Sequence, residues 1–351
     1  MIYRQQSYLP IIFQVDEGII YDISEYLKRN MLLFNKVLVV SGKSFSKKYA
    51  EEIARRNQWQ LYELADNTEA DIEQLKQKAI QENIELFVSV GGGKVIDAVK
   101  RVSLLIQVNN LAVPTIISND GLISPISVIK NKFGKTDSLP GMMPMGVVID
   151  IDIIKDSPIK FIRSAAGDIL SNVSATNDWI LAFQNSKEKM NDIAFHLSKS
   201  AANSLIHFDE INLKSKPFLR LVVQGQINSG IAMSLAGTSR PCSGSEHLIS
   251  HAIDHLDYGK NTLHGTQVAS ISLFTLYLQD KLEEKHIIYA KKSEIPLDFT
   301  DLTIDLSENL FCKLIDTARE MRPGRFTVLD CFSTPEIYRK LLAFKQFIAI
   351  K

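Results

Sequence analysis

Histidines are concentrated in one stretch of this sequence. Four of the seven, His247, His251, His255 and His264, fall within eighteen residues. Spacings of four place the first three along one side of a helix, and His264 opens the next element. Because neutral imidazole is the commonest metal ligand, two histidines from neighbouring helices plus a carboxylate would form a metal site with an open position for substrate. Hydrogen-bonded helix histidines are the alternative, but the density favours a metal site.

Gly167-Asp168 is the candidate source of the carboxylate. Asp168 follows a glycine at the expected start of a helix, shortly after the predicted domain boundary. An aspartate at that position also acts as a helix N-cap, and this role would be sufficient by itself. Both interpretations stay open at this point.

A glycine run is the second place where chemistry is expected. Residues 86–90 have strand composition, Gly91, Gly92 and Gly93 follow, and an amphipathic helical pattern continues to Val102. Glycines at such a turn let backbone N–H groups approach a ligand, and a helix N-terminus favours phosphate. The spacing is not that of the dinucleotide-binding motif, and glycines also occur there for packing. A nucleotide phosphate site and a packing role therefore both remain open.

Polar residues follow the next predicted strand, 111–117. Ser118, Asn119 and Asp120 stand at its end, where side chains can hydrogen-bond a cofactor or substrate. A helix cap or Asx turn is the equally common alternative.

The elements around these residues predict a parallel sheet. Strands are expected near residues 9–15, 36–41, 59–63, 86–90, 111–117 and 146–150, and helices near 19–29, 46–57, 70–81 and 94–106. Pro10 marks the first strand as an edge, and residues 125–140 are hairpin-like with a turn at 131–134. Alternating strands and helices indicate βαβ units, whose ligands bind beyond the carboxyl ends of the strands.

The character of the sequence changes past Pro158. Helical periodicity dominates from Ala165 onward, with long segments near residues 168–183, 192–206, 218–236, 246–256, 267–281 and 310–317. At 351 residues the length also favours two domains. We therefore predict an α/β domain over residues 1–158 and an all-helical domain over residues 159–351.

Composition excludes several classes of function. Lys+Arg and Asp+Glu both number 40, so the basic footprint of a nucleic-acid-binding protein is missing. No apolar run approaches the roughly 18 residues of a membrane span, and the N-terminus has no signal-peptide core. The three cysteines, Cys242, Cys312 and Cys331, lack zinc-site spacing and are odd in number. We expect a cytoplasmic protein with a small-molecule substrate and no nucleic-acid or membrane partner.

These residues together resemble the family of metal-dependent polyol dehydrogenases that includes glycerol dehydrogenase and sn-glycerol-1-phosphate dehydrogenase, within the wider dehydroquinate synthase-like superfamily. The resemblance rests on the glycine run with Lys94 to Asp97, on Gly167-Asp168 and on His264-Gly265. Residues 239–247, reading Ser-Arg-Pro-Cys-Ser-Gly-Ser-Glu-His, and residues 322–327 resemble the glycerol-phosphate branch. Asn119 departs from the family, where a histidine is usual.

The resemblance implies a fold, a cofactor and a set of site residues. The fold is a Rossmann-like parallel-sheet domain followed by a helical domain that holds metal and substrate. Asp168, His247 and His264 would bind one divalent metal, zinc in the first place, with nickel or iron as alternatives. Asp120, Asp168 and His251 would face the substrate, and a homo-oligomer is expected. The cofactor, NAD or NADP, would contact Gly91, Gly92, Gly93, Lys94, Val95, Ile96, Asp97, Thr115, Ile116, Ile117, Ser118 and Ser124.

Arg240 is the predicted substrate-phosphate ligand. It stands seven residues before His247 in a Ser-Arg-Pro turn, from which a bidentate guanidinium would reach a phosphate. A surface arginine that caps a helix is the alternative.

The implied reaction is hydride transfer between NAD(P)H and dihydroxyacetone phosphate, with sn-glycerol 1-phosphate as the reduced product. Three alternatives stay open on sequence grounds: a glycerol dehydrogenase, a dehydroquinate synthase-like lyase that keeps its cofactor through the cycle, and a catalytically silent binder of metal and nucleotide.

Overall fold

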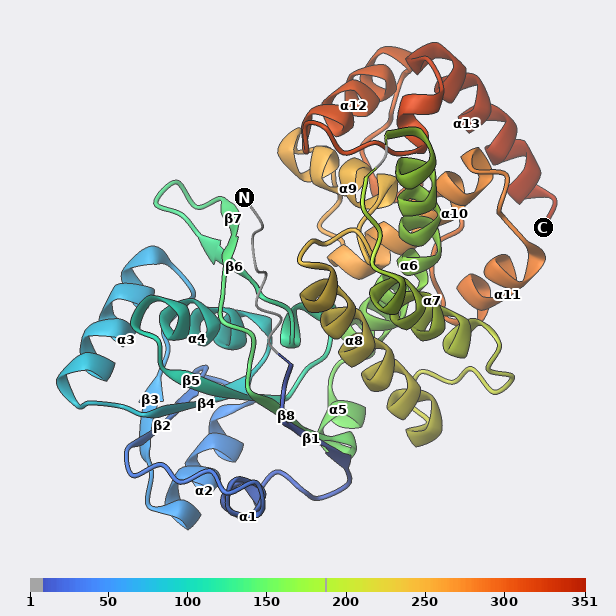
Figure 1. Cartoon of the computed structure of the whole chain (residues 1–351). Coiled ribbons are helices and arrows are strands. Elements are labelled where there is room, and N and C mark those ends of the chain that lie inside the picture. The colour runs from blue at the N-terminus through green and yellow to red at the C-terminus, as the bar shows by residue number, and fades with distance from the viewer. Residues whose placement is uncertain (1–8, 187) are drawn as a thin grey trace. The chain divides into compact units, whose positions relative to one another are not determined.

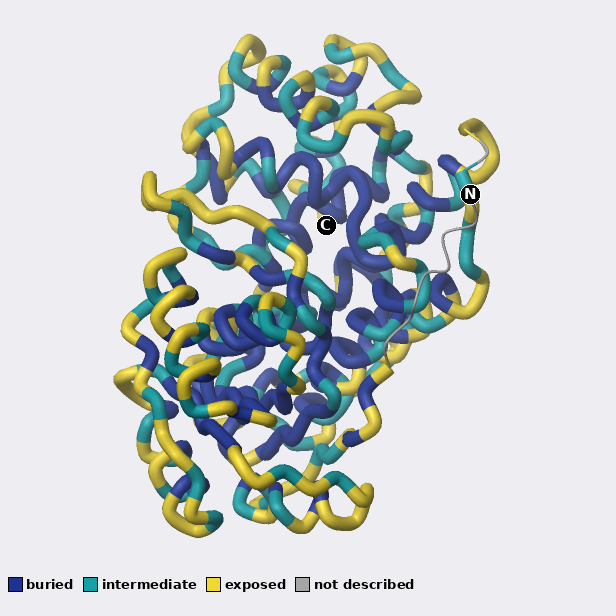
Figure 2. Tube along the Cα trace, turned by 60° about the vertical axis from the view of Figure 1, so that its left-hand side comes forward, coloured by how far each residue is buried: buried dark blue, intermediate teal, exposed yellow. Residues whose placement is uncertain are grey.

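The computed structural model describes residues 9–186 and 188–351, and the chain divides into two compact units, residues 1–158 and 159–351 (Figure 1). Each unit has its own buried interior, which Figure 2 shows as the dark trace inside a rim of exposed loops.

Within the described residues, unit 1 is built on six parallel strands in the order β1-β8-β5-β4-β2-β3. They are β1 (Ile12–Asp16), β2 (Val37–Ser41), β3 (Gln60–Glu63), β4 (Leu86–Gly91), β5 (Asn109–Pro114) and β8 (Gly146–Asp150). The predicted parallel sheet is confirmed, and β1 lies at its edge as Pro10 indicated. Counted from β2, the strand order is 2-1-3-4-5, so the topological switch point lies between β2 and β4.

Helices cover both faces of this sheet (Figure 1). Val37 and Val39 share one core with α1 (Ile23–Arg29) and α2 (Lys47–Asn57). Leu38 and Val40 point to the other face, where α3 (Glu69–Gln81) and α4 (Gly93–Ile106) pack. Alternate strand residues are therefore buried on opposite sides, as a parallel sheet requires.

Between β5 and β8 the chain forms the 3-10 turn η1 (Asp120–Leu122) and a separate antiparallel hairpin, β6 (Ile126–Lys130) with β7 (Thr136–Pro140). The predicted hairpin and its turn are confirmed. A short helix, α5 (Ile151–Asp156), follows β8 and was not predicted.

Unit 2 is helical, as predicted. Its helices are α6 (Ile159–Ser186), α7 (Asp192–Ile206), α8 (Lys216–Ala236), α9 (Ser245–His255), α10 (His264–Leu278), α11 (Glu284–Lys292), α12 (Glu308–Glu320) and α13 (Thr334–Ala349), with 3-10 turns η2 (Phe299–Leu302) and η3 (Val328–Cys331). Helix α10 is buried along nearly its whole length, and α6 packs against it and against α7, α8 and α9.

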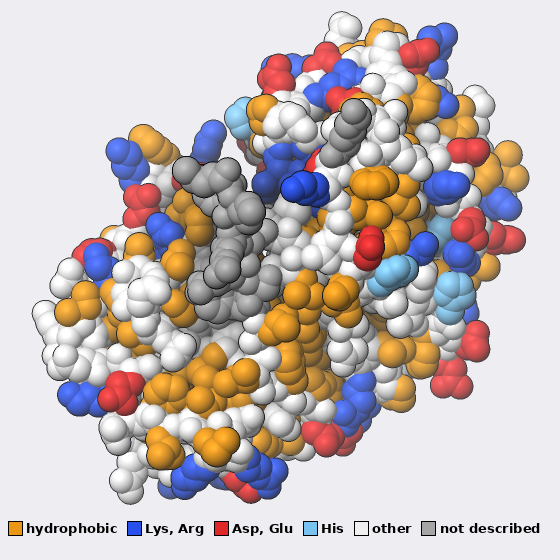
Figure 3. All heavy atoms as spheres, viewed as in Figure 1, with side chains coloured by type: hydrophobic (Ala, Val, Ile, Leu, Met, Phe, Trp, Pro, Cys, Tyr) orange, Lys and Arg blue, Asp and Glu red, His pale blue; other side chains and the backbone are white. Residues whose placement is uncertain are grey.

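The surface agrees with the zero formal charge. Acidic and basic side chains are interspersed over the face in Figure 3, and neither sign forms a continuous field. None of the helices in the described part of the chain is long and apolar enough to span a bilayer.

Candidate metal centre

Three helices of unit 2 bring Asp168, His247 and His264 together. Asp168 comes from α6, His247 from α9, and His264 is the first residue of α10. One ligand atom from each lies within 4.8 Å of the other two, and His247 Nε2 is 4.0 Å from Asp168 Oδ1. A carboxylate and two imidazoles at this separation can share one divalent ion.

Asp168 does not lie at a helix start, contrary to the expectation from the sequence. It lies inside α6, which begins nine residues earlier at Ile159, so the N-cap interpretation is wrong. The preceding Gly167 serves a packing purpose instead. A Cβ there would lie 2.5 Å from the carbonyl oxygen of Gly265, and a Cβ on Gly265 would lie 2.0 Å from the carbonyl oxygen of Ser164. The two glycines let α6 and α10 cross in backbone contact, and this brings the adjacent Asp168 and His264 close.

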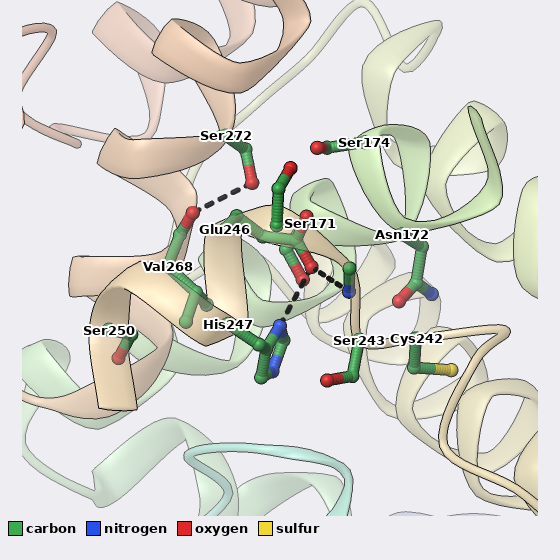
Figure 4. A network of polar contacts seen from close by, with 12 residues as sticks. Ser171, Asn172, Ser174, Cys242, Ser243, Glu246, His247, Ser250, Val268 and Ser272 are labelled. Atoms are coloured by element: carbon green, nitrogen blue, oxygen red, sulfur yellow. Dashed lines mark hydrogen bonds and ion pairs between the residues drawn. The ribbon is translucent and has the colours of Figure 1, made fainter. Parts of the chain in front are cut away.

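Each histidine of the triad is held through its Nδ1 atom. His247 Nδ1 lies 2.9 Å from Glu246 Oε1, which also accepts a hydrogen bond from the Gly244 backbone N–H at 2.6 Å (Figure 4). His264 Nδ1 lies 3.4 Å from Ser250 Oγ, whose hydroxyl donates to Gln267 Oε1 at 2.5 Å. Because the Nδ1–H of each ring donates to one of these oxygens, the Nε2 atom carries the lone pair that can bind a metal.

Electrostatics keep both rings in the neutral form. Burial lowers the pKa of His247 to about 3, and the nearby Arg325 and Arg322 guanidiniums add to this effect. Burial and the neighbouring His247 lower the pKa of His264 to about 3. Neutral imidazole is the form that binds a metal. The donor set, its support and its protonation therefore fit a divalent ion.

Behind the triad lies a buried acidic pair. Glu246 is fully buried, and burial raises the pKa of its carboxyl to about 7. Burial and the proximity of Glu246 raise the pKa of Asp178 to about 6. Asp178 Oδ2 accepts the Ser245 backbone N–H at 2.6 Å, and Oδ1 accepts the Val328 N–H at 2.8 Å. Asp178 thus ties the start of α9 to the start of η3.

The other two clustered histidines, His251 and His255, differ in their distance from the triad. His251 is stacked on His264, with ring centroids 5.9 Å apart, and lies 6.1 Å from His247. Burial lowers its pKa well below the ordinary value, and the two neighbouring imidazoles reinforce the shift. His255, one turn further along α9, is exposed and lies outside the triad.

In unit 1 the glycine turn lies where the sequence predicted it. Gly91 ends β4 and pairs with Pro114 of β5, and Gly93 starts α4 at the switch point of the sheet. A Cβ on Gly91 would lie 2.8 Å from the Val95 side chain, so packing explains this glycine. A Cβ on Gly92 would meet nothing closer than 3.8 Å, and one on Gly93 would meet nothing within 4 Å. Packing among the described residues does not explain these two glycines, and the space beside them would admit the close backbone approach of a ligand.

Four neighbouring residues predicted to contact the cofactor have side chains engaged elsewhere. Lys94 Nζ pairs with Asp66 at 2.6 Å, Val95 and Ile96 are buried in the domain core, and Asp97 pairs with Lys100 at 2.8 Å. What these positions offer a cofactor is therefore backbone at the helix start rather than side chains.

The second predicted cofactor segment lies beside the glycine turn. The Thr115 backbone N–H donates to the Gly91 carbonyl at 3.0 Å, which fixes the segment Thr115, Ile116, Ile117 and Ser118 at the same sheet edge. Asn119 forms the Asx turn that was the alternative for this stretch, because its Oδ1 accepts the Gly121 N–H at 3.1 Å.

A lysine that sequence reasoning missed organises the loop after this segment. Lys100 is fully buried, and its Nζ donates to the carbonyls of Gly121, Ser124 and Ile126. It thereby fixes the predicted site residues Ser124 and Asp120. Burial raises the pKa of Asp120 to about 6 against the attraction of Lys100. Its position four residues after the apolar Ile96, on the same face of α4, was the signal for a buried lysine.

Arg240 does not stand free to receive a phosphate. Its side chain is buried, its Nε donates to Glu188 Oε1 at 2.8 Å, Nη2 pairs with Glu188 Oε2, and Nη1 donates to the Phe326 carbonyl at 2.8 Å. The expected role of Arg240 in substrate binding, and its alternative as a surface cap, both lack support in this geometry.

Other residues of the site were not predicted because they contact the candidate metal-binding side chains rather than the metal itself. Glu246 and Ser250 stand within the histidine stretch, yet nothing in their spacing reveals that they orient His247 and His264. Asp178 is distant in sequence from the residues it joins.

Comparisons with known proteins agree with this arrangement. Residues 14–158 match the model of the iron-containing alcohol dehydrogenase family. The chain is 35% identical to a glycerol-1-phosphate dehydrogenase of Staphylothermus marinus over 92% of each chain, and 35% identical to one of Archaeoglobus fulgidus over 76% of each. In fold it is similar to a glycerol dehydrogenase from Schizosaccharomyces pombe, with a TM-score of 0.79 at 17% identity, covering 98% of this chain and 91% of that one. A probable glycerol dehydrogenase from Sinorhizobium meliloti gives a TM-score of 0.76 at 20% identity, covering 98% and 99%. The triad, the glycine turn and these relatives agree, and the chain belongs to the glycerol-1-phosphate dehydrogenase family of metal-dependent alcohol dehydrogenases.

Proposed function

We propose that this protein is a metal-dependent oxidoreductase that transfers a hydride between NAD(P)H and dihydroxyacetone phosphate, forming sn-glycerol 1-phosphate. The observation that carries the proposal is the convergence of Asp168, His247 and His264 within 4.8 Å in a buried, neutral environment. The relatives that match over nine-tenths of the chain are named for this activity and for NAD(P)+.

Asp168 and the Nε2 atoms of His247 and His264 would hold the metal, for which zinc is the first candidate. When bound, a divalent ion polarises a carbonyl and lowers the pKa of a ligating hydroxyl by many units, which is the chemistry that interconversion of a ketone and an alcohol requires. Three protein ligands leave a position open for substrate.

His251 is the candidate for moving the proton. It lies against both metal-binding imidazoles, and its lowered pKa keeps the ring neutral, with one nitrogen able to accept and the other able to donate. In the alcohol-oxidising direction it would accept the hydroxyl proton, and in the reducing direction it would return it.

The cofactor would lie at the sheet edge of unit 1. Its pyrophosphate is proposed to bind the backbone at Gly92, Gly93 and the start of α4, where partial positive charge and open space coincide. The Thr115 to Ser118 segment and Ser124 would contact the remainder. A cytoplasmic location and a homo-oligomeric state stay predictions.

A spectrophotometric screen tests the proposal. Dihydroxyacetone phosphate and dihydroxyacetone are each supplied with NADH and with NADPH, and consumption of reduced nicotinamide is followed. Turnover with strong preference for the phosphorylated ketone supports the proposal. Equal rates on the two ketones would favour glycerol dehydrogenase activity, and no net cofactor oxidation would exclude both dehydrogenases.

A further inference from the structure

Four oxygen atoms surround the ammonium of Lys100 inside unit 1. The side chain is fully buried, and its Nζ pairs with Asp97 Oδ1 at 2.8 Å. The other three oxygens are backbone carbonyls, those of Gly121 at 2.5 Å, Ser124 at 3.3 Å and Ile126. An ammonium has three N–H donors, so these oxygens use all of them and leave none for a ligand. Lys100 therefore acts on other parts of the chain rather than on a bound molecule.

A lysine is an expensive residue to bury at this position. Burying an ammonium costs free energy unless it is paired and hydrogen-bonded, and an apolar residue would pack in α4 without that cost, as the fully buried Val99 and Val102 do. An apolar residue cannot donate to the three carbonyls, however, and they would lose these donors. The benefit of Lys100 thus lies in the backbone that carries the carbonyls.

The three carbonyls belong to one turn, residues 120–126, which includes η1 and leads into β6. Lys100 holds this turn near its beginning, in its middle and at its end, so the position of the ammonium sets the path of the whole turn. Two predicted site residues belong to it. Asp120 directly precedes one of the bound carbonyls, and Ser124 supplies another. A shift of Lys100 would therefore displace both.

Charge is the second effect of Lys100 on this turn. The charged groups of the described residues that act on Asp120 are Lys100, which attracts its carboxylate, and Asp97, which repels it, and both belong to α4. Burial raises the pKa of Asp120 to about 6, and the attraction of Lys100 opposes that rise. An ionised carboxylate only accepts hydrogen bonds, which suits a substrate hydroxyl. Near neutral pH, Lys100 thus helps to keep Asp120 in the accepting form.

We propose that Lys100 is a positioning residue for the reaction. It holds the 120–126 turn so that Asp120 meets a substrate hydroxyl and Ser124 meets the cofactor, and Asp97 is its counter-ion. This inference rests on the proposed function for the ligands of Asp120 and Ser124. It gives a role in catalysis to two residues of α4 that act through the turn rather than on a ligand.

The test compares zinc-loaded wild type with Lys100→Met, Asp97→Asn and the control Val102→Ala. Methionine fills the space of the lysine stem without its charge or donors, and asparagine removes the counter-charge but leaves the lysine. Val102 is fully buried on the same helix and has no polar side-chain atom, so its truncation reports loss of packing alone. The readouts are the melting temperature, the affinity for reduced cofactor by nicotinamide fluorescence, and kcat/KM for dihydroxyacetone phosphate as a function of pH.

We expect Lys100→Met to weaken cofactor binding and to lower kcat/KM by about ten- to hundredfold, because a misplacement of about 1 Å can cost ~10²-fold. Val102→Ala should lower the melting temperature and keep both constants. The acid limb of kcat/KM should move to higher pH in Lys100→Met, which removes the attraction, and to lower pH in Asp97→Asn, which removes the repulsion. The titration of the substrate itself is the same for every variant, so these shifts belong to the protein.

Lys100 is a structural residue alone if Lys100→Met matches Val102→Ala in kcat/KM, pH dependence and cofactor affinity. If Lys100→Met does not fold, Asp97→Asn decides: an acid limb at lower pH supports the proposal, and an unshifted limb overturns it. If wild type reduces neither ketone, the proposed function fails, and cofactor affinity then decides. Weaker affinity in Lys100→Met than in Val102→Ala supports the role of Lys100, and equal affinities overturn it.

Discussion

At the scale of single residues, the proposed metal centre depends on the hydrogen bonds that orient its donor side chains. Glu246 holds His247 and Ser250 holds His264, each through Nδ1, and His247 Nε2 lies 4.0 Å from Asp168 Oδ1. Burial keeps the two imidazoles neutral, so no proton competes with a cation near neutral pH.

Replacing His264 by alanine removes one of three protein ligands. We expect His264→Ala to lose bound metal and to abolish turnover. Metal content by elemental analysis and the initial rate with dihydroxyacetone phosphate measure this, and the exposed His255→Ala is the matched control. Normal metal content and activity in His264→Ala would show that the triad is misassigned.

Glu246→Gln tests the support of His247. The amide keeps the size of the side chain and an oxygen acceptor but removes the charge, so metal affinity should fall about tenfold, at the lower end for residues that orient metal ligands. The affinity is measured by competition with a chelator, beside Glu308→Gln on the surface of α12. An unchanged zinc affinity would mean that Glu246 serves packing alone.

At the scale of elements, the site depends on backbone contact between α6 and α10. A Cβ at Gly265 would lie 2.0 Å from the Ser164 carbonyl oxygen, so the helices must separate. Gly265→Ala should lower the free energy of unfolding by about 1–3 kcal/mol and weaken metal binding. Gly93→Ala, which meets open space, is the control and should leave stability unchanged. Equal stability of the two variants would contradict this account of the crossing.

At the glycine turn, a larger side chain is expected to affect ligand binding rather than stability. A Cβ at Gly92 would lie 3.8 Å from the nearest atom, in the Ile116 side chain, so the first carbon of a valine side chain fits and the fold should tolerate it. The bulk should nevertheless displace the cofactor pyrophosphate and raise the KM for reduced cofactor about tenfold, as expected from losing one hydrogen bond to a charged group. A wild-type KM in Gly92→Val would remove this turn from the cofactor site.

The sequence allowed correct predictions where a residue's role depends on its neighbours in the chain, and failed where the role depends on contacts with distant residues. Strand composition, the glycine turn and helical periodicity are local signals, and they predicted the parallel sheet, the hairpin and the helical unit. Gly167 suggested a helix boundary because glycine weakens an isolated helix, whereas its benefit arises from α10, a hundred residues away. Arg240 suggested a ligand because its counter-ion Glu188 and the Phe326 carbonyl are distant in sequence. The same limit hid Asp178, which joins Ser245 and Val328.

At the scale of the whole molecule, the proposed cofactor groups belong to unit 1 and the proposed metal ligands to unit 2, and each unit has its own core. The two kinds of binding should therefore respond independently to substitution. Gly92→Val should retain its metal, and His264→Ala should bind reduced cofactor with wild-type affinity, as measured by nicotinamide fluorescence. Loss of cofactor affinity in correctly folded His264→Ala would contradict this independence.

The most direct test of the central claim is the rate of NAD(P)H oxidation with dihydroxyacetone phosphate in protein stripped of metal by a chelator and then reconstituted with zinc. The account predicts no turnover in the stripped protein, recovery on addition of zinc, and no recovery in His264→Ala. Full activity after verified removal of metal, or no activity with any divalent ion restored to a folded protein, would contradict it.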